Sequence, residues 1–362
     1  MSEKKEISGE NIKPIGLIYP YWRGRIFAII GLLALLLLVI VFATSIGSVE
    51  IPFGTTSGIL ISRLPFVDIT PSWEKTIESI VIDWRLPRVI LAGLVGAALA
   101  LAGATYQGLF RNPLADPYLI GVAQGAALGA VIGFLIPVSG VGMGIGLVPV
   151  LAFAGALLSV MVVYFIARVG KTVPVTTLIL AGVALGALLG AIVAYLAITS
   201  GQMLHGIMFW LSGSFSLSQW SEVKIVLPVI VVGAIVILLF SRMLNIMQLD
   251  EEQAQQLGIN VERLKIILLA AATMVTAAAV SFVGIIGFVG IIIPHAVRLI
   301  WGPDYRFLLP LSLVSGAIFL ILADVLARTI VAPSEIPIGV ITALCGAPFF
   351  LYLLRRRAKM LF

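Results

Sequence analysis

The sequence has very little charge and almost no cysteine or histidine for a chain of its length. Only 11% of its 362 residues are charged, whereas a soluble domain carries about 25%. Cys345 is the single cysteine, which excludes an internal disulfide and a cysteine-rich metal site. The two histidines, His205 and His295, are far apart and predict no metal cluster. These shortages argue against an ordinary soluble domain and against a bound metal.

Signatures for nucleotide binding and catalysis are also missing. The run at 170–172, Gly-Lys-Thr, looks like the end of a phosphate-binding loop, but Phe165 stands where the first glycine is required. This run also follows a hydrophobic stretch rather than a β-strand, and the glycine-rich run at 140–146 is predicted to be a loop between spans. No nucleophile–base pair or paired carboxylate set is recognisable. We therefore expect no enzymatic activity, and energy must come from elsewhere.

Long apolar runs dominate what the sequence does contain. Hydrophobic residues make up 60% of the chain and the mean hydropathy is +1.15, too apolar for a soluble core of this length. The runs are continuous rather than alternating, which predicts membrane-spanning helices and not barrel strands. A span needs about 20 apolar residues. We predict an all-α polytopic membrane protein with about ten spans, at 26–44, 86–108, 117–137, 147–168, 175–199, 223–241, 264–283, 288–301, 307–330 and 337–354.

The basic residues predict how these spans are oriented. Most of the 23 Lys and Arg lie in segments on the side shared by both termini, including the cluster at 355–359. Because cytoplasmic loops are enriched in Lys and Arg, we expect both ends in the cytoplasm. The run at 288–301 is short for a simple span, so we expect it to be partly re-entrant. Two longer external segments follow, at 45–85 and 200–222, the second amphipathic enough to lie at the membrane interface.

Ionisable residues are nearly absent from the interiors of the predicted spans. Ion-driven carriers usually keep such residues there, so their scarcity argues against an ion-coupled secondary transporter, which we retain as the alternative. Asp324 is the exception, and Arg328 lies one helical turn later. A structural ion pair between them is favoured over a proton relay. We interpret His295 as a helix-end or packing histidine rather than a ligand or base.

The most polar internal segment, 244–262, predicts a short amphipathic helix. Three acidic residues at its start suit the positive end of a helix, and a glycine at its end can terminate it. Leu249, Ala254 and Leu257 form an apolar stripe. The pattern leaves open whether this helix binds a partner or lies on its own bundle. The residues assigned to the segment's function are Asp250, Glu251, Glu252, Gln255, Leu257 and Gly258.

Glycines recur every four residues in two predicted spans. Small residues at this spacing let helix backbones approach closely in lipid. We expect them to pack helices within the bundle, and a dimer face is the alternative. The residues are Gly121, Gly125, Gly129, Gly182, Gly186 and Gly190.

Six stretches in a fixed order resemble a known transport family. They are Arg85–Arg88, Arg111–Pro117, Leu180–Gly186, Gly287–Arg298, Ala323–Arg328 and Glu335–Pro348. Together they resemble the permease subunits of type II ABC importers for iron chelates (siderophore or haem) and vitamin B12. The likeness covers most of residues 80–356, and the first 80 residues match only in character.

The resemblance implies a fold of ten helices per subunit and a homodimer with the translocation path between its subunits. It also implies two ATPase subunits inside, which carry ATP and Mg²⁺, and a substrate-binding protein outside. This chain itself is then expected to bind no cofactor, metal or nucleic acid. The expected cargo is a bulky ferric siderophore, haem or cobalamin. The expected organisation is a cytoplasmic segment at 1–25, one inner-membrane permease domain at 26–356 and a cytoplasmic tail at 357–362.

The resemblance also implies roles for individual residues. Arg85 and Arg328 look like the positions that meet acidic residues on the two lobes of the binding protein. The alternatives are that Arg85 anchors a helix end at the headgroups and that Arg328 only pairs with Asp324. Val175 and Thr176 resemble the positions of the cytoplasmic gate, although the family often has small hydroxyl residues there. The segment 244–262 becomes the element that couples the chain to the ATPases.

Overall fold

The computed structural model describes residues 18–361 except 48, 64, 66, 68–69, 137–145, 171 and 250, with the backbone alone described at 18–21, 251, 352–354 and 356–361. Apart from one β-bridge between Val169 and Thr172, the regular elements in this part of the chain are helical. In chain order they are α1 (Ile18–Ser45), α2 (Phe53–Ser62), α3 (Lys75–Ser79), η2 (Ile80–Arg85), α4 (Leu86–Leu109), η3 (Pro117–Ile120), α5 (Val122–Leu135), α6 (Leu147–Ala167), α7 (Val175–Thr199), η4 (Gly201–Met203), α8 (Leu204–Leu211), α9 (Trp220–Leu239), α10 (Ser241–Ile246), α11 (Glu251–Gln256), α12 (Val261–Val283), α13 (Val289–Trp301), α14 (Tyr305–Thr329) and α15 (Ile338–Leu361).

Each predicted span corresponds to an apolar helix in the described residues. Seven helices there are long and apolar enough to cross a membrane, namely α1, the continuous stretch α3–η2–α4, α6, α7, α9, α12 and α14. Three shorter apolar helices, α5, α13 and the first part of α15, account for the remaining predicted spans. Helix α13 has 13 residues, about 20 Å at 1.5 Å per residue, which is less than the bilayer core of about 30 Å.

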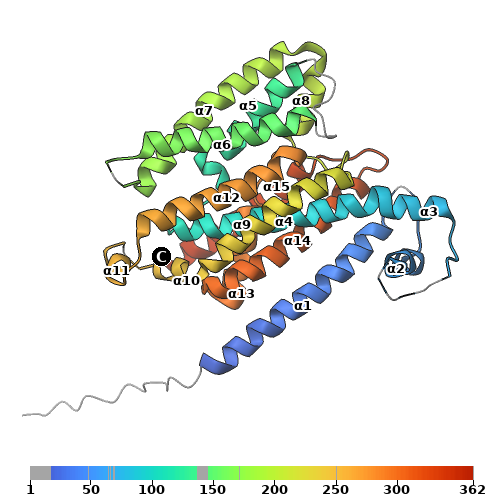
Figure 1. Ribbon diagram of the computed structural model, residues 1–362, viewed down its shortest axis with the longest axis horizontal. Helices are drawn as coiled ribbons and strands as arrows, with labels where there is room; N and C mark the ends of the chain where they lie inside the picture. The colour runs from blue at the N-terminus through green and yellow to red at the C-terminus, as the bar shows by residue number, and fades with distance from the viewer. Residues whose placement is uncertain are drawn as a thin grey trace, which may run out of the picture.

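The helices form two groups that lie side by side (Figure 1). Helices α5, α6, α7 and α8 pack on one another in the first group. The second group contains α1, α4, α9, α13 and α14, and α12 joins the two by packing against both α4 and α6. The first turn of α1 and the C-terminal end lie toward the end of the bundle that carries α10 and α11. We call this the α11 end and the opposite one, with α2 and α3, the α3 end.

Helix α4 is the centre of the larger group. Its run from Val95 to Leu109 is buried throughout, because α9, α12, α13 and α14 surround it. The run is rich in alanine and glycine, whose small side chains allow close helix crossings in lipid. A Cβ on Gly96 would lie 2.2 Å from the carbonyl oxygen of Gly316 on α14, and one on Gly103 would lie 1.9 Å from that of Gly290 on α13.

Replacing Gly103 with alanine is expected to lower the thermal unfolding midpoint of the purified protein. The added Cβ forces the backbones of α4 and α13 apart, and overpacking of this kind costs about 1–3 kcal/mol. Gly31→Ala is the matched control, since its added Cβ meets no atom within 4 Å. Both midpoints are to be measured by intrinsic fluorescence in one detergent. Equal midpoints would contradict a tight α4–α13 crossing.

Helix α1 lies at the edge of the bundle and exposes apolar side chains along most of its length. At the α11 end it is held by aromatic and charged contacts with α14. Trp22 stacks edge-on against Phe307 at 5.2 Å between ring centroids, and the guanidinium of Arg25 lies 5.1 Å over the same ring. Arg25 also lies 3.6 Å from Asp304, and Arg306 covers Trp22 at 5.0 Å. The exposed length of α1 therefore faces lipid while its ends are fixed.

Asp304 connects α1, α10 and α14 at the α11 end. Its carboxylate caps α14 by accepting from the backbone N–H of Arg306, and it accepts from the side chain of Asn245 on α10 at 2.8 Å. Burial pushes the pKa of Asp304 upward, but hydrogen bonds from Arg306 and Asn245 outweigh it, so the pKa lies below its ordinary value. The carboxylate therefore stays charged and holds the three elements together.

Candidate functional site

A polar cavity of about 340 Å³ opens at the α3 end. It combines positive and negative side chains contributed by η2, α4, α14 and the loops before α9 and α15. Its lining residues are Gly47, Trp84, Arg85, Arg88, Phe215, Ser216, Ser218, Arg328, Thr329, Ala332, Pro333 and Glu335. Both arginines that the sequence predicts for docking lie in this cavity, 243 positions apart in the chain (328 − 85).

Arg85 is 7% exposed and turns toward the carboxyl end of α1 rather than outward. Its guanidinium donates to the carbonyl oxygens of Thr44 at 3.1 Å and Ser45 at 2.8 Å, and also to that of Val49. The last carbonyls of a helix have no intrahelical partner and carry partial negative charge, so a guanidinium is a suitable cap. Arg85 thus anchors a helix end, but within the protein and not at lipid headgroups.

Arg328 makes the same kind of contact from the opposite side. It donates to the carbonyl oxygens of Ala43 at 2.7 Å and Ile46 at 2.9 Å. The predicted ion pair with Asp324 is present, with 3.5 Å between Arg328 Nε and the carboxylate. Two arginines therefore hold the last turn of α1 between α4 and α14, in addition to any role that they have in docking.

Arg88 is the principal partner of Asp324, a pairing that the helical spacing does not predict. Its guanidinium lies 2.8 Å from Asp324 and 2.7 Å from Glu335, and it bonds both carboxylates in a forked geometry. Glu335 also accepts from the hydroxyl of Ser216 at 2.6 Å. Asp324 and Arg88 are almost enclosed, so this network is a structural unit and not an open proton path. Arg88 and Glu335 both lie within the six stretches that carry the family resemblance, which is the signal that could have found them.

Glu335 is the exposed member of this network, with 31% of its side chain accessible. Partial burial raises its pKa, but the hydrogen bonds from Arg88 and Ser216 outweigh that effect and hold the pKa below its ordinary value. The carboxylate is therefore ionised near neutral pH. It joins α4 to the loops that precede α9 and α15.

At the α11 end, the segment 244–262 forms two short helices instead of the single helix that the sequence predicts. Asn245 donates to Asp304 and accepts from the backbone N–H of Tyr305 at 2.9 Å. Gln248 donates to the carbonyl oxygen of Gly108 at 3.1 Å. These bonds commit residues 245–248 to the bundle, so α10 ends and α11 begins afresh at the acidic run. The hydrophobic pattern cannot report such side-chain bonds.

Helix α11 projects from the bundle with its outer residues accessible (Figure 1). Leu257 is 62% exposed and Leu249 is 44% exposed, and Glu252 and Gln255 are also exposed. The predicted stripe is corrected at Ala254, which lies within α11 and is buried against the chain itself, whereas Leu249 and Leu257 flank that helix and are exposed. Gly258 ends this turn with a φ of +83°, a conformation that favours glycine. Asp250 and the side chain of Glu251 lie outside the described residues.

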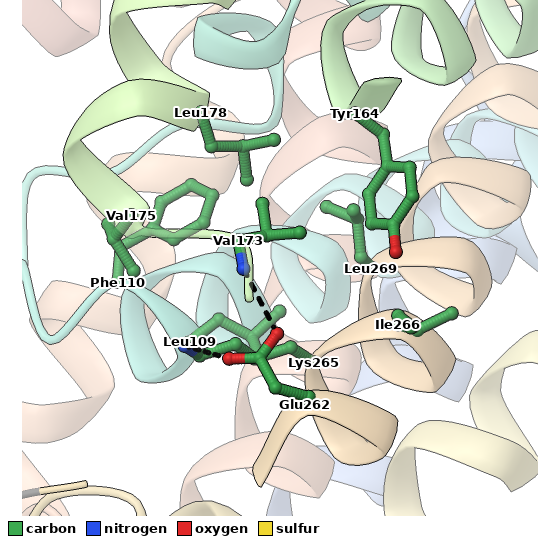
Figure 2. Close-up of a pocket in the computed structure, with 10 residues that line it drawn as sticks. All are labelled: Leu109, Phe110, Tyr164, Val173, Val175, Leu178, Glu262, Lys265, Ile266 and Leu269. Atoms are coloured by element: carbon green, nitrogen blue, oxygen red, sulfur yellow. Dashed lines mark hydrogen bonds and ion pairs between the residues drawn. The ribbon is translucent and has the colours of Figure 1, made fainter. Parts of the chain in front are cut away.

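Val175 and Thr176 open α7 beside the tight turn that follows α6. Val175 lines a small apolar cavity of about 20 Å³ between α4, α6, α7 and α12, whereas Thr176 is exposed (Figure 2). Figure 2 also shows Glu262 of α12 reaching across to the backbone N–H of Val173, at 3.1 Å. The structure thus brings the predicted gate next to the segment predicted to couple with the ATPases.

The six predicted packing glycines lie in three structural settings: close helix crossings, a left-handed turn, and positions with room for a side chain. Gly125 and Gly129 lie where α5 crosses α6, and a Cβ on Gly129 would lie 1.9 Å from the carbonyl oxygen of Leu151. A Cβ on Gly182 would likewise lie 2.2 Å from the carbonyl oxygen of Leu119. Gly121 has a φ of +87° and links η3 to α5, so its role is conformational. Gly186 and Gly190 leave room for a Cβ beside Gln124, which differs from the predicted close packing within one chain.

The described residues contain no cluster of three or more His, Cys, Asp or Glu side chains able to hold a metal ion. Cys345 is free and exposed in α15. His295 is buried in α13 and stacks edge-on against Phe349, with 6.3 Å between ring centroids. The chemistry of the sites above is therefore that of hydrogen bonds, ion pairs and apolar surfaces.

Comparison with known proteins finds similar membrane transport subunits. Residues 35–356 match the FecCD transport family. The cobalamin import system permease BtuC of Halobacterium salinarum is 51% identical over 283 residues, which cover 78% of this chain and 75% of that protein. The hemin transport system permease HmuU of Yersinia pestis is 42% identical over 284 residues, which cover 76% and 83% respectively.

A solved structure supports the same comparison at the level of the fold. The inward-facing conformation of a metal-chelate type ABC transporter superposes with a TM-score of 0.78 and 31% sequence identity. The alignment covers 91% of this chain and 98% of that one. Similarity therefore extends over the bundle as a whole, including the short helices as well as the long spans.

Proposed function

The chain belongs to the FecCD transport family and is a multi-pass inner-membrane permease of ABC importers for iron chelates or cobalamin; on that premise we propose that two copies form the translocation path for a ferric siderophore, haem or cobalamin. The observation that carries the proposal is the extent of the family match, from residue 35 within α1 to residue 356 within α15, which includes every helix between them. The chain is accordingly a transport subunit and not itself an enzyme.

The open face of α7 supports a path between two copies. Helix α7 is among the least buried spans, and Leu180, Ile192 and Ile198 on it are exposed. Gly186 and Gly190 lie on this helix with no neighbouring backbone packed against them. We propose that the second copy approaches here, with α7 of each subunit beside the path. A bulky cargo then needs a broad and weakly binding passage rather than a tight pocket.

Energy is proposed to come from two partner ATPase subunits that bind ATP and Mg²⁺. The exposed Leu249 and Leu257 at the projecting α11 end support this, because they offer apolar side chains that a partner subunit can cover. In this proposal the α11 end lies in the cytoplasm, and ATP-driven closure of the ATPases moves α11. Movement of α11 then changes the gate at Val175 and Thr176.

Docking of a substrate-binding protein is proposed at the α3 end. The cavity there is lined by three arginines and the carboxylate of Glu335, and Asp324 lies behind it against Arg88, so positive charge is in excess. Acidic residues on the binding protein complement such a surface and orient it. Arg85 and Arg328 would serve this purpose only after some movement, because both now donate to the end of α1.

Uptake into proteoliposomes tests the proposed function. The chain is to be reconstituted with its ATPase subunit, and the binding protein and substrate are to be added outside. Cyanocobalamin is the first substrate to measure because the cobalamin permease shares more identity with this chain than the hemin permease does; haemin and ferric citrate follow. We expect uptake of one of these chelates that requires both ATP and the binding protein.

The alternative, an ion-coupled secondary transporter, makes the opposite prediction in the same vesicles. Uptake that persists without ATP and collapses with an ionophore would contradict the ABC importer assignment. The matched control is an ATPase subunit with a Lys-to-Ala substitution in its phosphate-binding loop, since this change removes hydrolysis and leaves the permease unchanged.

A further inference from the structure

The turn between α6 and α7 is internally braced. The backbones of Val169 and Thr172 bond each other in both directions, at 2.9 and 3.1 Å. The hydroxyl of Thr177, in the first turn of α7, donates to the carbonyl oxygen of Ala167 at the end of α6 at 3.0 Å. These bonds tie the described residues of this connector, 168–170 and 172–174, to the start of α7.

Glu262 reaches this connector from a different helix. One oxygen of its carboxylate accepts the backbone N–H of Val173 at 3.1 Å, and the other accepts from Lys265 Nζ at 3.1 Å (Figure 2). A hydrogen bond to an ionised acceptor is roughly twice as strong as a neutral one. Val173 is buried, and the next two residues are Pro174 and Val175. The bond therefore holds the chain directly before the predicted gate.

Glu262 is the last residue of the coupling segment 244–262. It lies in the first turn of α12, whose N-terminal cap is Asn260. The backbone N–H of Ile259 donates to the carbonyl oxygen of Ala254 at 3.2 Å, which fixes α11 to the start of α12. A displacement of α11 is thus carried to Glu262 over a few residues of braced backbone.

The small cavity beside this bond leaves unfilled space between the connector, α4 and α12, into which side chains can move. Val173, Val175 and Leu178 line it from the α7 side, and Leu109 and Leu269 line it from α4 and α12. A void next to a packed contact lets side chains shift without displacing both helices. The connector can then follow α12 while the rest of α7 keeps its contacts with α5 and α6.

We propose that Glu262 is a positioning residue that transmits movement of the coupling segment to the connector 168–174, and so to Val175 and Thr176. This inference rests on the proposed function, because it assigns the link between the ATPase contact and the gate. It predicts that loss of the Glu262–Val173 bond separates ATP hydrolysis from transport without preventing assembly.

Three variants in the reconstituted complex test this link. Glu262→Ala removes the acceptor and is expected to lower the chelate transported per ATP hydrolysed by about tenfold or more, the size expected for loss of one bond to a charged group. Glu262→Gln keeps an oxygen acceptor for the Val173 N–H and is expected to restore most of the ratio. Lys265→Met removes the ion pair but leaves the Val173 bond, so its ratio is expected to stay within about twofold of wild type.

The transport-to-hydrolysis ratio distinguishes transmission from a merely structural role, which would lower assembly or both rates together. A wild-type ratio in Glu262→Ala would overturn the inference while leaving the importer assignment intact. Failure of the wild-type complex to transport any chelate would instead count against the proposed function.

Hydrogen exchange on the wild-type complex provides a second measurement that needs no variant to fold. ATP binding is expected to change the protection of the Val173 amide together with that of residues 251–260. A change confined to residues 251–260, with Val173 unaltered, would overturn the proposed link.

Discussion

Asp324→Ala is expected to prevent most of the chain from accumulating as a folded, monodisperse protein. Its carboxylate is the enclosed counter-charge of Arg88 at 2.8 Å and of Arg328 at 3.5 Å, and only 2% of its side chain is accessible. Removing one partner of a buried ion pair costs about 3–5 kcal/mol. Here the change leaves one carboxylate, the partly exposed Glu335, for the guanidiniums of Arg88 and Arg328. The cost is a large fraction of the stability of a typical protein, about 5–15 kcal/mol.

Two further variants make this prediction specific to the buried charge. Glu335→Gln alters the other carboxylate of Arg88, but it is 31% exposed and retains polar groups toward Ser216, so a much smaller loss is expected. Asp324→Ala combined with Arg88→Met removes the stranded charge and is expected to recover part of the loss. Detergent-solubilised yield and thermal unfolding midpoint are the measurements. The interpretation is wrong if Asp324→Ala and Glu335→Gln have the same midpoint.

Reversing the charge of Arg85 and Arg328 together is expected to abolish uptake. The double variant Arg85→Glu with Arg328→Glu places carboxylates where guanidiniums now donate to the end of α1, and it also repels an acidic docking surface. Loss of a buried charged contact costs about 2–5 kcal/mol, which corresponds to a fall of about 30-fold or more. Arg63→Glu is the matched control, because Arg63 is an exposed arginine at the same end of the bundle.

Neutral variants separate docking from anchoring. Arg85→Gln with Arg328→Gln keeps amide donors for the carbonyl oxygens of α1 but removes the charges that attract acidic residues. We expect its thermal midpoint to fall less than that of the charge-reversed pair, while capture of the binding protein and uptake both fall as strongly. Normal capture by the charge-reversed pair would sink the docking assignment. A lowered midpoint with normal capture would leave anchoring of α1 as the role of both arginines.

The spans and their limits could be predicted closely from the sequence. The predicted run at 175–199 coincides with α7, and that at 288–301 differs from α13 by one residue. Each span depends on how a single continuous segment partitions into lipid, so local hydropathy and flanking charges suffice. The family resemblance could also be found from local sequence, since each of the six stretches is short and their order can be read along the chain.

The sites could be predicted only in part. The apolar exposure of Leu257 and the turn at Gly258 follow from local pattern, and both lie at the projecting α11 end. The break between α10 and α11 does not, because it depends on bonds from Asn245 to the start of α14, 59 positions away. The use of Gly103 and Gly290 at one of the closest crossings likewise depends on which helices become neighbours.

The sequence by itself therefore determined the membrane class, the spans, the family and the position of the polar segment that contains α11. Only the tertiary structure decided that Asp324 pairs chiefly with Arg88, that Arg85 and Arg328 hold the end of α1, and that Glu262 joins α12 to the start of α7. The physical reason is the range of each interaction. Hydrophobic length and loop charge act within one segment, whereas these ion pairs and hydrogen bonds join residues that only folding brings together.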